Sequence, residues 1–529
     1  DLLAAADRLR RLSRDGRRTL LGDVLDAAID VARLRVPALS PVPIVEDVDY
    51  DRVVVPVETR PDDFRGFEIR QGRRRHAEAR LAPHLVGYVS AFTESDVERA
   101  IRKYPGWPGR GYFMQLRAGR DGVERAFDEL LRGQFGVECV ERDHMNHRQR
   151  ELATAPPTPG RDLVLTIDSR LQKVVEDQMA HALYRDGRAA VGAAVFVDVR
   201  NGHVLAVASS PAYDPACFQD AHAYRSVVQD PDRPLFNRAL RGRLPLGSVF
   251  KVVTALAALE AGAVPAGVDC VGQVRCGRRY FRCHRAHGHV DLREAIQRSC
   301  NSFFYITARK AGDRALIEMA RRLGFGRETG LRFPDEASGS VPARAPGGEL
   351  LNLAIGQGEL VVTPLQVARM MAAVANGGTL VPPKLVRELR PFQSDDGGEP
   401  PAGPRRPVDL GISDASLAAV RDGLCRVVNE PGGTGRRAFA HWSRPFQVCG
   451  KTSTAQRTVR RDGELTADNV GWFAGYAPHK APRVAFAVAV ERLSGGQSGG
   501  RTAGPIARDI LERIPLDLLG LGAEGGARR

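Results

Sequence analysis

Two lysines and a pair of serines have spacings that could support chemistry. Only seven of the 77 Lys and Arg residues are lysines, and arginine, unlike lysine, cannot lose its proton in a protein. In so arginine-rich a chain, two of the retained lysines stand where a titratable amine is needed. Lys251 follows Ser248 by three residues in the only Ser-x-x-Lys of the chain, Lys451 opens Lys451-Thr452-Ser453-Thr454, and Ser299-Cys300-Asn301 lies between them.

The Ser248–Lys251 pair is typical of a serine nucleophile with a lysine base. A serine hydroxyl reacts poorly until a base removes its proton, and positions three apart share one face of a helix. Free lysine has a pKa near 10.4, so a lysine base must be desolvated or placed beside another cation. Residues 249, 250, 252 and 253 are apolar and Lys451 could be that cation. The alternative is an ordinary helix that carries Ser and Lys.

The second motif could relay protons and orient a substrate. We predict that Ser299 passes a proton to a leaving amine, and that Asn301 orients both a substrate amide and Lys251. The alternative is structural: Ser299 is a polar residue at a helix end, and Asn301 is the N-cap of a following helix at Ser302–Ala308.

The third motif is suited to binding an anion. Lys451 and Thr452 offer a cation and a hydroxyl that could bind a terminal carboxylate. The backbone N–H groups of Ser248 and Thr454 are the predicted oxyanion hole, where loss of one donor typically costs about a hundredfold or more in rate.

The elements that must position these motifs fall into two predicted domains, because 529 residues exceed one ordinary core. Residues 153–160 contain three prolines and are predicted to be a linker. In the second domain, predicted strands are followed by a long helical block and then by further strands and a helix. This order favours a sheet with helices packed on it, whose strands come from both ends of the domain. Predicted helices are Leu2–Leu12, Leu20–Leu34, Ser169–Ala182, Ser248–Leu259 and Pro505–Ile514. Predicted strands are Arg52–Val57, Ala193–Val199 and His203–Ala208 (joined at Asn201-Gly202), Phe446–Val448, Gly471–Tyr476 and Val484–Glu491. Pro391–Pro407 is predicted to be a mobile loop.

Charge and hydropathy exclude some classes of function. No uncharged apolar run reaches the 18 residues of a membrane span. The net charge of +14 suits anionic envelope polymers or lipid head groups, although solvated surface arginines explain it equally well. No nucleic-acid-binding motif accompanies this charge.

The chain resembles the class B penicillin-binding proteins, and among them the penicillin-binding protein 2 group of the cell-elongation machinery. Ser-x-x-Lys, Ser-x-Asn and Lys-Thr occur in the family's order. Further similarity covers most of the chain: residues 84–89, 122–133, 162–168, 206–214, 234–239, 354–359 and 363–366.

This resemblance implies a fold, an activity and partners. The fold is mixed α+β: an irregular α+β pedestal domain (residues 1–158) that binds a partner, then a transpeptidase domain (159–519) with an antiparallel sheet flanked by helices and an all-helical subdomain, then a disordered tail (520–529). The activity is peptidoglycan D,D-transpeptidation through an acyl-enzyme on Ser248, inhibited by β-lactams and requiring no catalytic cofactor. Also implied are a stem-peptide substrate, a membrane glycosyltransferase partner bound through the pedestal, a membrane anchor upstream of Asp1 and an extracytoplasmic location.

Ser453 departs from the family pattern. The third motif usually reads Lys-Thr-Gly, and glycine lets neighbouring backbone or substrate approach closely. Serine adds only a small side chain, so we expect an altered fit of substrate or β-lactam rather than inactivity.

A cysteine–histidine cluster precedes and enters the second motif. Cys270, Cys276, Cys283 and Cys300 lie among three histidines, and such a density of thiols and imidazoles suits tetrahedral zinc. By resemblance to family members with a zinc site here, the ligands of a structural zinc are His287 and Cys300 together with Cys283 and Cys270. The alternatives are a disulfide among Cys270, Cys276 and Cys283, with Cys300 as a small buried apolar residue. The other cysteines, Cys139, Cys217, Cys425 and Cys449, are predicted to be scattered buried thiols.

Two other functions share these motifs. A D,D-carboxypeptidase or a class D-like β-lactamase passes the acyl group to water. The first domain argues against this interpretation, because a hydrolase of small β-lactams has no need for 150 additional residues. A catalytically silent scaffold that activates a polymerase is the other, and the presence of all three motifs argues against it.

Overall fold

The structure is a computed structural model that describes residues 59, 81–103, 116–133, 136–143, 148–182, 190–391, 406–461, 464–493 and 496–521. Residue contacts divide the chain into two compact units. The first contains residues 1–79, 89–120 and 133–158, and the second contains 80–88, 121–132 and 159–529. The helices predicted at Leu2–Leu12 and Leu20–Leu34, the strand at Arg52–Val57, the loop at 392–405 and the tail at 522–529 lie outside the described residues.

The first unit is small and irregular in its described part. Strands β1 (Val89–Ala91) and β2 (Arg117–Gly119) pair antiparallel, as do β3 (Val137–Arg142) and β4 (Arg148–Ala155). Helix α5 (Glu94–Lys103) buries Val97 against Phe92 and Ala118. Strand β4 occupies the first part of the predicted 153–160 linker, so that prediction is wrong up to residue 155, and the three prolines follow the strand's end.

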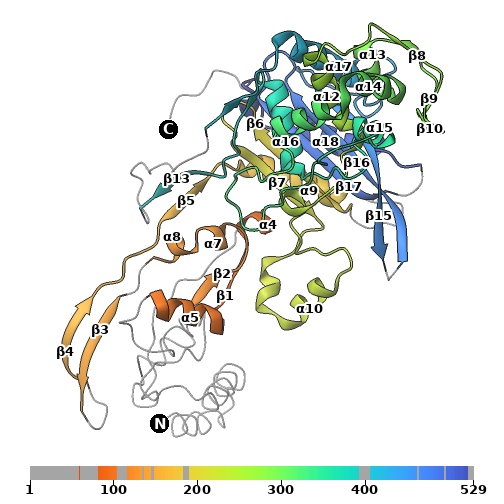
Figure 1. Cartoon of the computed structure of the whole chain (residues 1–529). Coiled ribbons are helices and arrows are strands. Elements are labelled where there is room, and N and C mark those ends of the chain that lie inside the picture. Colours follow the sequence, from red (N-terminus) through yellow and green to blue (C-terminus); the bar gives the residue numbers. More distant parts are fainter. Residues whose placement is uncertain are drawn as a thin grey trace, which may run out of the picture. The chain divides into compact units, whose positions relative to one another are not determined.

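The second unit is built on a five-stranded antiparallel sheet in the order β15-β16-β17-β6-β7 (Figure 1). The hairpin predicted at Asn201-Gly202 joins β6 (Gly192–Asp198) to β7 (Val204–Ser210), and every residue of both strands is buried. The other strands are β15 (Cys449–Arg461), β16 (Glu464–Ala477) and β17 (Val484–Leu493). Strand β15 lies at the edge of the sheet and pairs with β16.

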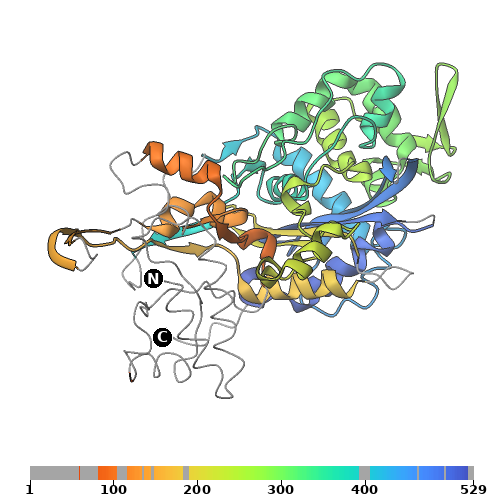
Figure 2. The same cartoon turned by 90° about the horizontal axis from the view of Figure 1, so that it is seen from below.

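Helices cover both faces of this sheet (Figure 2). Helices α9 (Ser169–His181) and α18 (Ala503–Arg513) pack together on one face. Helix α16 (Pro364–Ala375), which is buried along its whole length, packs on the other face. Residues 80–88 and 121–132 join this unit because Gly87 and Gly122 allow close backbone contact between helices α4 (Pro83–Val86) and α7 (Gly122–Ala126). The second unit is therefore discontinuous in sequence.

A helical subdomain lies beside the sheet and carries the first two motifs (Figure 1). It contains η4 (Gly247–Phe250), α12 (Lys251–Glu260), α13 (Leu292–Gln297), α14 (Asn301–Arg322), α15 (Gly348–Ala354) and α17 (Asp414–Asn429). The sheet flanked by helices and the all-helical subdomain confirm the predicted fold class. The remaining elements are α8 (Asp128–Arg132), β5 (Asp162–Leu165), η3 (Pro215–Gln219), α10 (Ala221–Gln229), α11 (Arg238–Arg241), β8 (Val268–Cys270), β9 (Gln273–Cys276), β10 (Arg279–Arg282), β11 (Gly288–Val290), β12 (Thr379–Leu380), β13 (Val386–Arg390), β14 (Val408–Asp409), η5 (Gly499–Arg501) and η6 (Leu516–Leu519).

The strand predicted at Phe446–Val448 is wrong, because β15 begins only at Cys449. The backbone just before it is bonded to other partners. The carbonyl of Gln447 accepts from the backbone N–H of His479, and the carbonyl of Val448 accepts from the Asn429 side chain. These contacts replace sheet pairing and hold the start of the edge strand.

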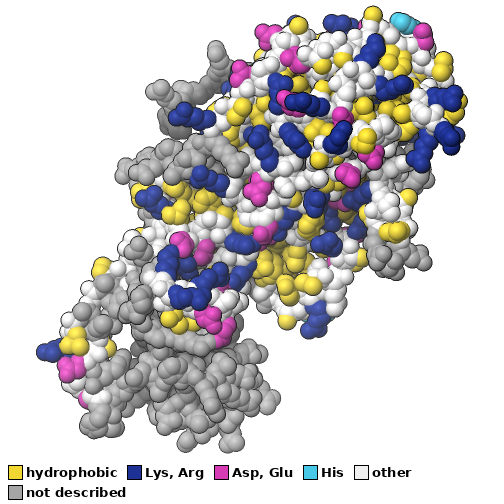
Figure 3. Space-filling view, viewed as in Figure 1, with side chains coloured by type: hydrophobic (Ala, Val, Ile, Leu, Met, Phe, Trp, Pro, Cys, Tyr) yellow, Lys and Arg dark blue, Asp and Glu magenta, His cyan; other side chains and the backbone are white. Residues whose placement is uncertain are grey.

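The surface charge is dispersed over the face seen in Figure 3, where Lys and Arg side chains alternate with acidic and apolar ones. Among the described helices, none combines the length and apolar character that a bilayer span requires.

Candidate active site

Ser248 lies in the turn η4 that leads into helix α12. Gly247 has a φ of +58° and donates to the carbonyl of Gly356 at 2.8 Å. A Cβ on Gly356 would lie 2.3 Å from the Gly247 carbonyl oxygen, so this backbone approach requires glycine. Val249 and Phe250 are fully buried, whereas Ser248 is partly exposed. The turn thus anchors its apolar neighbours and leaves the serine accessible.

Lys251 begins α12 and is fully buried. Its Nζ donates to the Ser299 carbonyl at 2.7 Å, to Ser299 Oγ at 3.0 Å and to Asn301 Oδ1 at 2.6 Å. Burial lowers the pKa of Lys251 from 10.5 to about 7. A large fraction of this amine is therefore neutral near neutral pH, as a base requires.

Ser299 and Asn301 are held at a sharp turn between α13 and α14. Ser299 has a φ of +56°, in the left-handed region that non-glycine residues rarely adopt. The turn aims both its carbonyl and its hydroxyl at Lys251. Asn301 is the first residue of α14 and Cys300 is the N-cap, so the predicted N-cap role of Asn301 is wrong. The Asn301 side chain is committed to Lys251 and to the carbonyl of Arg282.

The third motif lies on the edge strand β15, close to the second buried amine. Lys451 is fully buried. Burial, and then repulsion from Lys251, hold the pKa of Lys451 well below its usual range. Thr452 Oγ1 lies 2.6 Å from Thr434 Oγ1, which places a pair of hydroxyls beside the strand. The structure therefore brings the predicted lysines together in one buried region.

Ser453 and Thr454 hold the loops on either side of the strand. Ser453 Oγ donates to the carbonyl of Leu246 at 2.9 Å, directly before the Ser248 turn. Thr454 Oγ1 accepts from the backbone N–H of Gly499 at 3.1 Å. A Cβ on Gly247 would lie 2.4 Å from Ser453 Oγ, so the serine side chain fits because position 247 is glycine. The added hydroxyl thus points at the turn that carries Ser248.

Replacing Ser453 with glycine, the residue usual in the family, should destabilise the chain. The variant loses a buried hydrogen bond to Leu246, worth about 1 kcal/mol, and the strand gains backbone freedom worth roughly 0.5–1 kcal/mol. We expect the free energy of unfolding, measured by chemical denaturation, to fall by about 1–2 kcal/mol. Ser453→Ala is the matched control for the hydroxyl alone, and wild-type stability in both variants would show that the Leu246 contact contributes nothing.

The cysteine cluster includes Cys300, the middle residue of the second motif. Donor atoms of Cys270, Cys283, His287 and Cys300 all lie within 4.8 Å of one another. His287 Nδ1 is 3.5 Å from the sulfurs of both Cys270 and Cys283. Cys276 is not in this group, and His289 instead pairs with Asp269.

The electrostatics of this cluster suit a metal. Burial lowers the pKa of His287, which favours the neutral, ligating imidazole. The Cys300 thiol hydrogen-bonds to Cys283, which lowers the pKa of Cys283 and raises that of Cys300. The backbone N–H of Asn301 also donates to Cys283 Sγ at 3.2 Å. Three sulfurs and one imidazole nitrogen are a donor set that fits tetrahedral zinc, and they contact the residue that holds Lys251.

Two of the remaining cysteines were not predicted correctly. Cys425 and Cys449 form a disulfide and are not scattered thiols. This disulfide joins α17 to the start of β15, and the two cysteines are 24 residues apart in the sequence. Cys217 is a buried free thiol as predicted, and Cys139 lies on β3.

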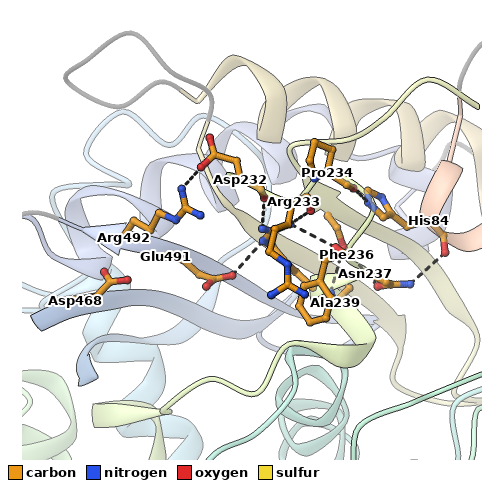
Figure 4. Close-up of polar contacts among 12 residues, drawn as sticks. His84, Asp232, Arg233, Pro234, Phe236, Asn237, Ala239, Asp468, Glu491 and Arg492 are labelled. Atoms are coloured by element: carbon orange, nitrogen blue, oxygen red, sulfur yellow. Dashed lines mark hydrogen bonds and ion pairs between the residues drawn. The ribbon is translucent and has the colours of Figure 1, made fainter. Parts of the chain in front are cut away.

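A polar network not predicted from the sequence anchors the segment before the Ser248 turn (Figure 4). Arg238 Nε lies 3.3 Å from Glu491 on β17, and Glu491 also pairs with Arg457 of β15 at 2.8 Å. Burial lowers the pKa of His84 to about 4, so a neutral ring donates from Nε2 to the carbonyl of Pro234. The residues lie far apart in sequence, and only the similarity at 234–239 hinted at a role for this segment.

A serine one turn from a buried lysine, in a turn that packs against the edge strand of an antiparallel sheet, is typical of serine enzymes that use a lysine base. Comparison with known families narrows the class. The penicillin-binding protein transpeptidase domain matches residues 192–512, and the penicillin-binding protein dimerisation domain matches residues 9–165. The chain belongs to the penicillin-binding proteins, in the class B penicillin-binding protein 2 group.

Individual relatives agree with this assignment. Peptidoglycan D,D-transpeptidase MrdA of Escherichia coli K12 is 30% identical over 485 residues, which cover 86% of this chain and 73% of that protein. The Pseudomonas aeruginosa PBP2 structure in complex with WCK 5153 is 32% identical, with a TM-score of 0.67, and the match covers 84% of this chain and 92% of that one. PBP2 of Helicobacter pylori in complex with MreC shares the fold, with a TM-score of 0.77 at 22% identity over 99% of this chain and 92% of that one.

Proposed function

We propose that this chain is a peptidoglycan D,D-transpeptidase in which Ser248 is the nucleophile and Lys251 its base. The observation that carries the proposal is the fully buried Lys251 amine, held by Ser299 and Asn301 one helical turn from Ser248. Its pKa of about 7 suits proton transfer near neutral pH.

Acylation follows from these contacts. Neutral Lys251 accepts the Ser248 proton as Oγ attacks the carbonyl carbon of the penultimate D-alanine in a stem peptide. The backbone N–H groups of Ser248 and Thr454 stabilise the oxyanion that forms. The bond to the terminal D-alanine then breaks, and Ser299, hydrogen-bonded to Lys251, passes a proton to the departing amine. An amine from a neighbouring peptide strand next attacks the ester. Its proton passes through Lys251 to Ser248 Oγ as the ester bond breaks, which completes the cross-link.

Lys451 and Thr452 bind the terminal carboxylate of the stem peptide, or that of a β-lactam. Protonation of Lys451 is favoured when an anion binds beside it, because the negative charge offsets its desolvation and the repulsion from Lys251. Thr452, paired with Thr434, adds hydroxyl donors. Ser453 acts through the Leu246 carbonyl, and thereby on the turn that carries Ser248.

A structural zinc held by Cys270, Cys283, His287 and Cys300 completes the proposed site. Such an ion braces the Ser299–Asn301 turn and takes no part in the reaction. The donor set and the contact from Asn301 N–H to Cys283 support this assignment.

We infer the partners and location from similar proteins. The relatives include an H. pylori PBP2 in complex with MreC and a peptidoglycan synthase complex that coordinates polymerization and crosslinking. We infer that residues 1–158 form a pedestal that binds a membrane glycosyltransferase, with 159–519 as the catalytic domain. The chain then acts at the extracytoplasmic face of the membrane, held by an anchor upstream.

Intact-mass spectrometry of the purified chain with excess benzylpenicillin tests this function. We expect one long-lived adduct on the wild type and none on Ser248→Ala. Ser302→Ala, which alters a buried serine one residue past the second motif, is the control that should keep the adduct. Rapid consumption of the drug without an adduct would instead indicate a hydrolase, and neither adduct nor turnover would indicate a silent scaffold.

A further inference from the structure

A second cysteine–histidine group lies at the start of the active-site strand. His479 Nδ1 lies 3.0 Å from Cys425 Sγ and 3.3 Å from Cys449 Sγ. The three donors come from separate elements: Cys425 from α17, Cys449 from the first residue of β15, and His479 from the loop after β16. Cys449 is fully buried and Cys425 nearly so. A disulfide alone does not need an imidazole within hydrogen-bond distance of both sulfurs.

Backbone contacts hold these three donors in place independently of the sulfurs. The His479 N–H donates to the carbonyl of Gln447 at 3.0 Å. Asn429 Nδ2 donates to the carbonyls of Cys425 at 2.8 Å and Val448 at 3.0 Å. The group therefore remains assembled when the bond between the sulfurs is absent. Because Cys449 lies two residues before Lys451, the group also adjoins the proposed carboxylate site.

We propose that Cys425, Cys449 and His479 form a redox-gated metal site: a disulfide when oxidised, and a site for a soft divalent cation such as Zn²⁺ when reduced. A dithiol or phosphine reductant supplies two electrons, the S–S bond breaks, and two protons complete the thiols. Binding of the cation then displaces those two protons, and the reductant leaves oxidised. In either state α17 stays linked to the start of β15.

The chemistry of the reduced state favours a cation. Two thiolates and a neutral imidazole around Zn²⁺ carry no net charge, which suits a buried position. Bonds of about 2.3 Å to sulfur and 2.0–2.1 Å to nitrogen require the sulfurs to separate to roughly 3.8 Å. A tetrahedral ion has a fourth position, which a water or a backbone carbonyl can fill.

Zinc content per chain, measured on the folded full-length chain by elemental analysis after desalting, tests this proposal. One sample is kept oxidised and the other is reduced with a phosphine, and both are supplied with excess zinc. We expect the reduced wild type to hold one more zinc than the oxidised wild type. Cys425→Ser, Cys449→Ser and His479→Gln should each lose this increment, and the thermal stabilisation by zinc that accompanies it.

Two comparisons keep the result specific to this group. Cys217→Ser removes a buried thiol outside both clusters and should retain the increment. Zinc held by Cys270, Cys283, His287 and Cys300 is present in both the wild type and Cys425→Ser. It therefore does not contribute to the difference in zinc content between these two chains. Equal zinc in reduced wild type and reduced Cys425→Ser would overturn the proposal. A disulfide that stays intact until the chain unfolds would overturn it as well.

Discussion

The Lys251→Arg variant is expected to lose most of its acylation by penicillin while keeping its fold. The guanidinium can still donate to Ser299 and Asn301, but it cannot give up its proton. Removing a positioned general base typically costs about 10²–10⁴-fold in rate. We therefore expect the second-order rate constant of acylation, followed with a fluorescent penicillin, to fall by that factor.

The pH profile of acylation provides a readout that a structural role for Lys251 would not change. Its pKa of about 7 means that the amine is mostly protonated below pH 7 and mostly neutral above it. Only the neutral amine accepts a proton, so the wild-type rate should rise with pH through about 7. Lys310→Arg, at an exposed position of α14, is the matched control and should keep both the rate and the profile. Wild-type acylation by Lys251→Arg, or the same pH limb in that variant, would exclude Lys251 as the base.

Much of the fold could be predicted because its strongest signals are local. Alternative strand partners for β6 and β7 are limited by the Asn201-Gly202 turn, and the apolar residues of both strands are all buried. The boundary of β15 was missed because Phe446–Val448 alternates apolar and polar residues as a strand does. Its backbone partners, His479 and Asn429, are distant in sequence, and no local pattern reveals them.

The site shows the same division between local and distant information. Spacing within Ser-x-x-Lys indicates a shared helix face, but not that the Lys251 amine bonds to the carbonyl of Ser299. That contact depends on the left-handed backbone conformation of Ser299. A serine rarely adopts this conformation, so the sequence does not predict it. Likewise the orientation of Ser453 depends on Gly247, more than 200 positions earlier. The density of cysteines near residue 283 was visible in the sequence, whereas Cys425, Cys449 and His479 converge only in the fold.

Loss of the cluster behind the second motif should weaken both stability and catalysis, which a merely buried cysteine would not do. Cys283 accepts from the backbone N–H of Asn301, whose side chain in turn holds Lys251. In Cys283→Ser we expect loss of the bound zinc and a fall of about 4 kcal/mol or more in the free energy of unfolding, because binding of a structural zinc contributes directly to folding. Acylation should slow by about 10–100-fold, the range typical when a partner that orients a metal-site residue is lost.

The control for this prediction is Cys276→Ser, which changes a nearby cysteine outside the group of four donors. It should keep zinc content, stability and acylation rate. If zinc is absent from the wild type and Cys283→Ser acylates normally, the four residues pack as thiols and an imidazole without a metal. If instead Cys276→Ser and Cys283→Ser lose stability equally, without any loss of zinc, a disulfide links those two cysteines. Zinc content separates these outcomes from the expected one. Only if the ion holds the Ser299–Asn301 turn in place should its loss be accompanied by slower acylation of Ser248.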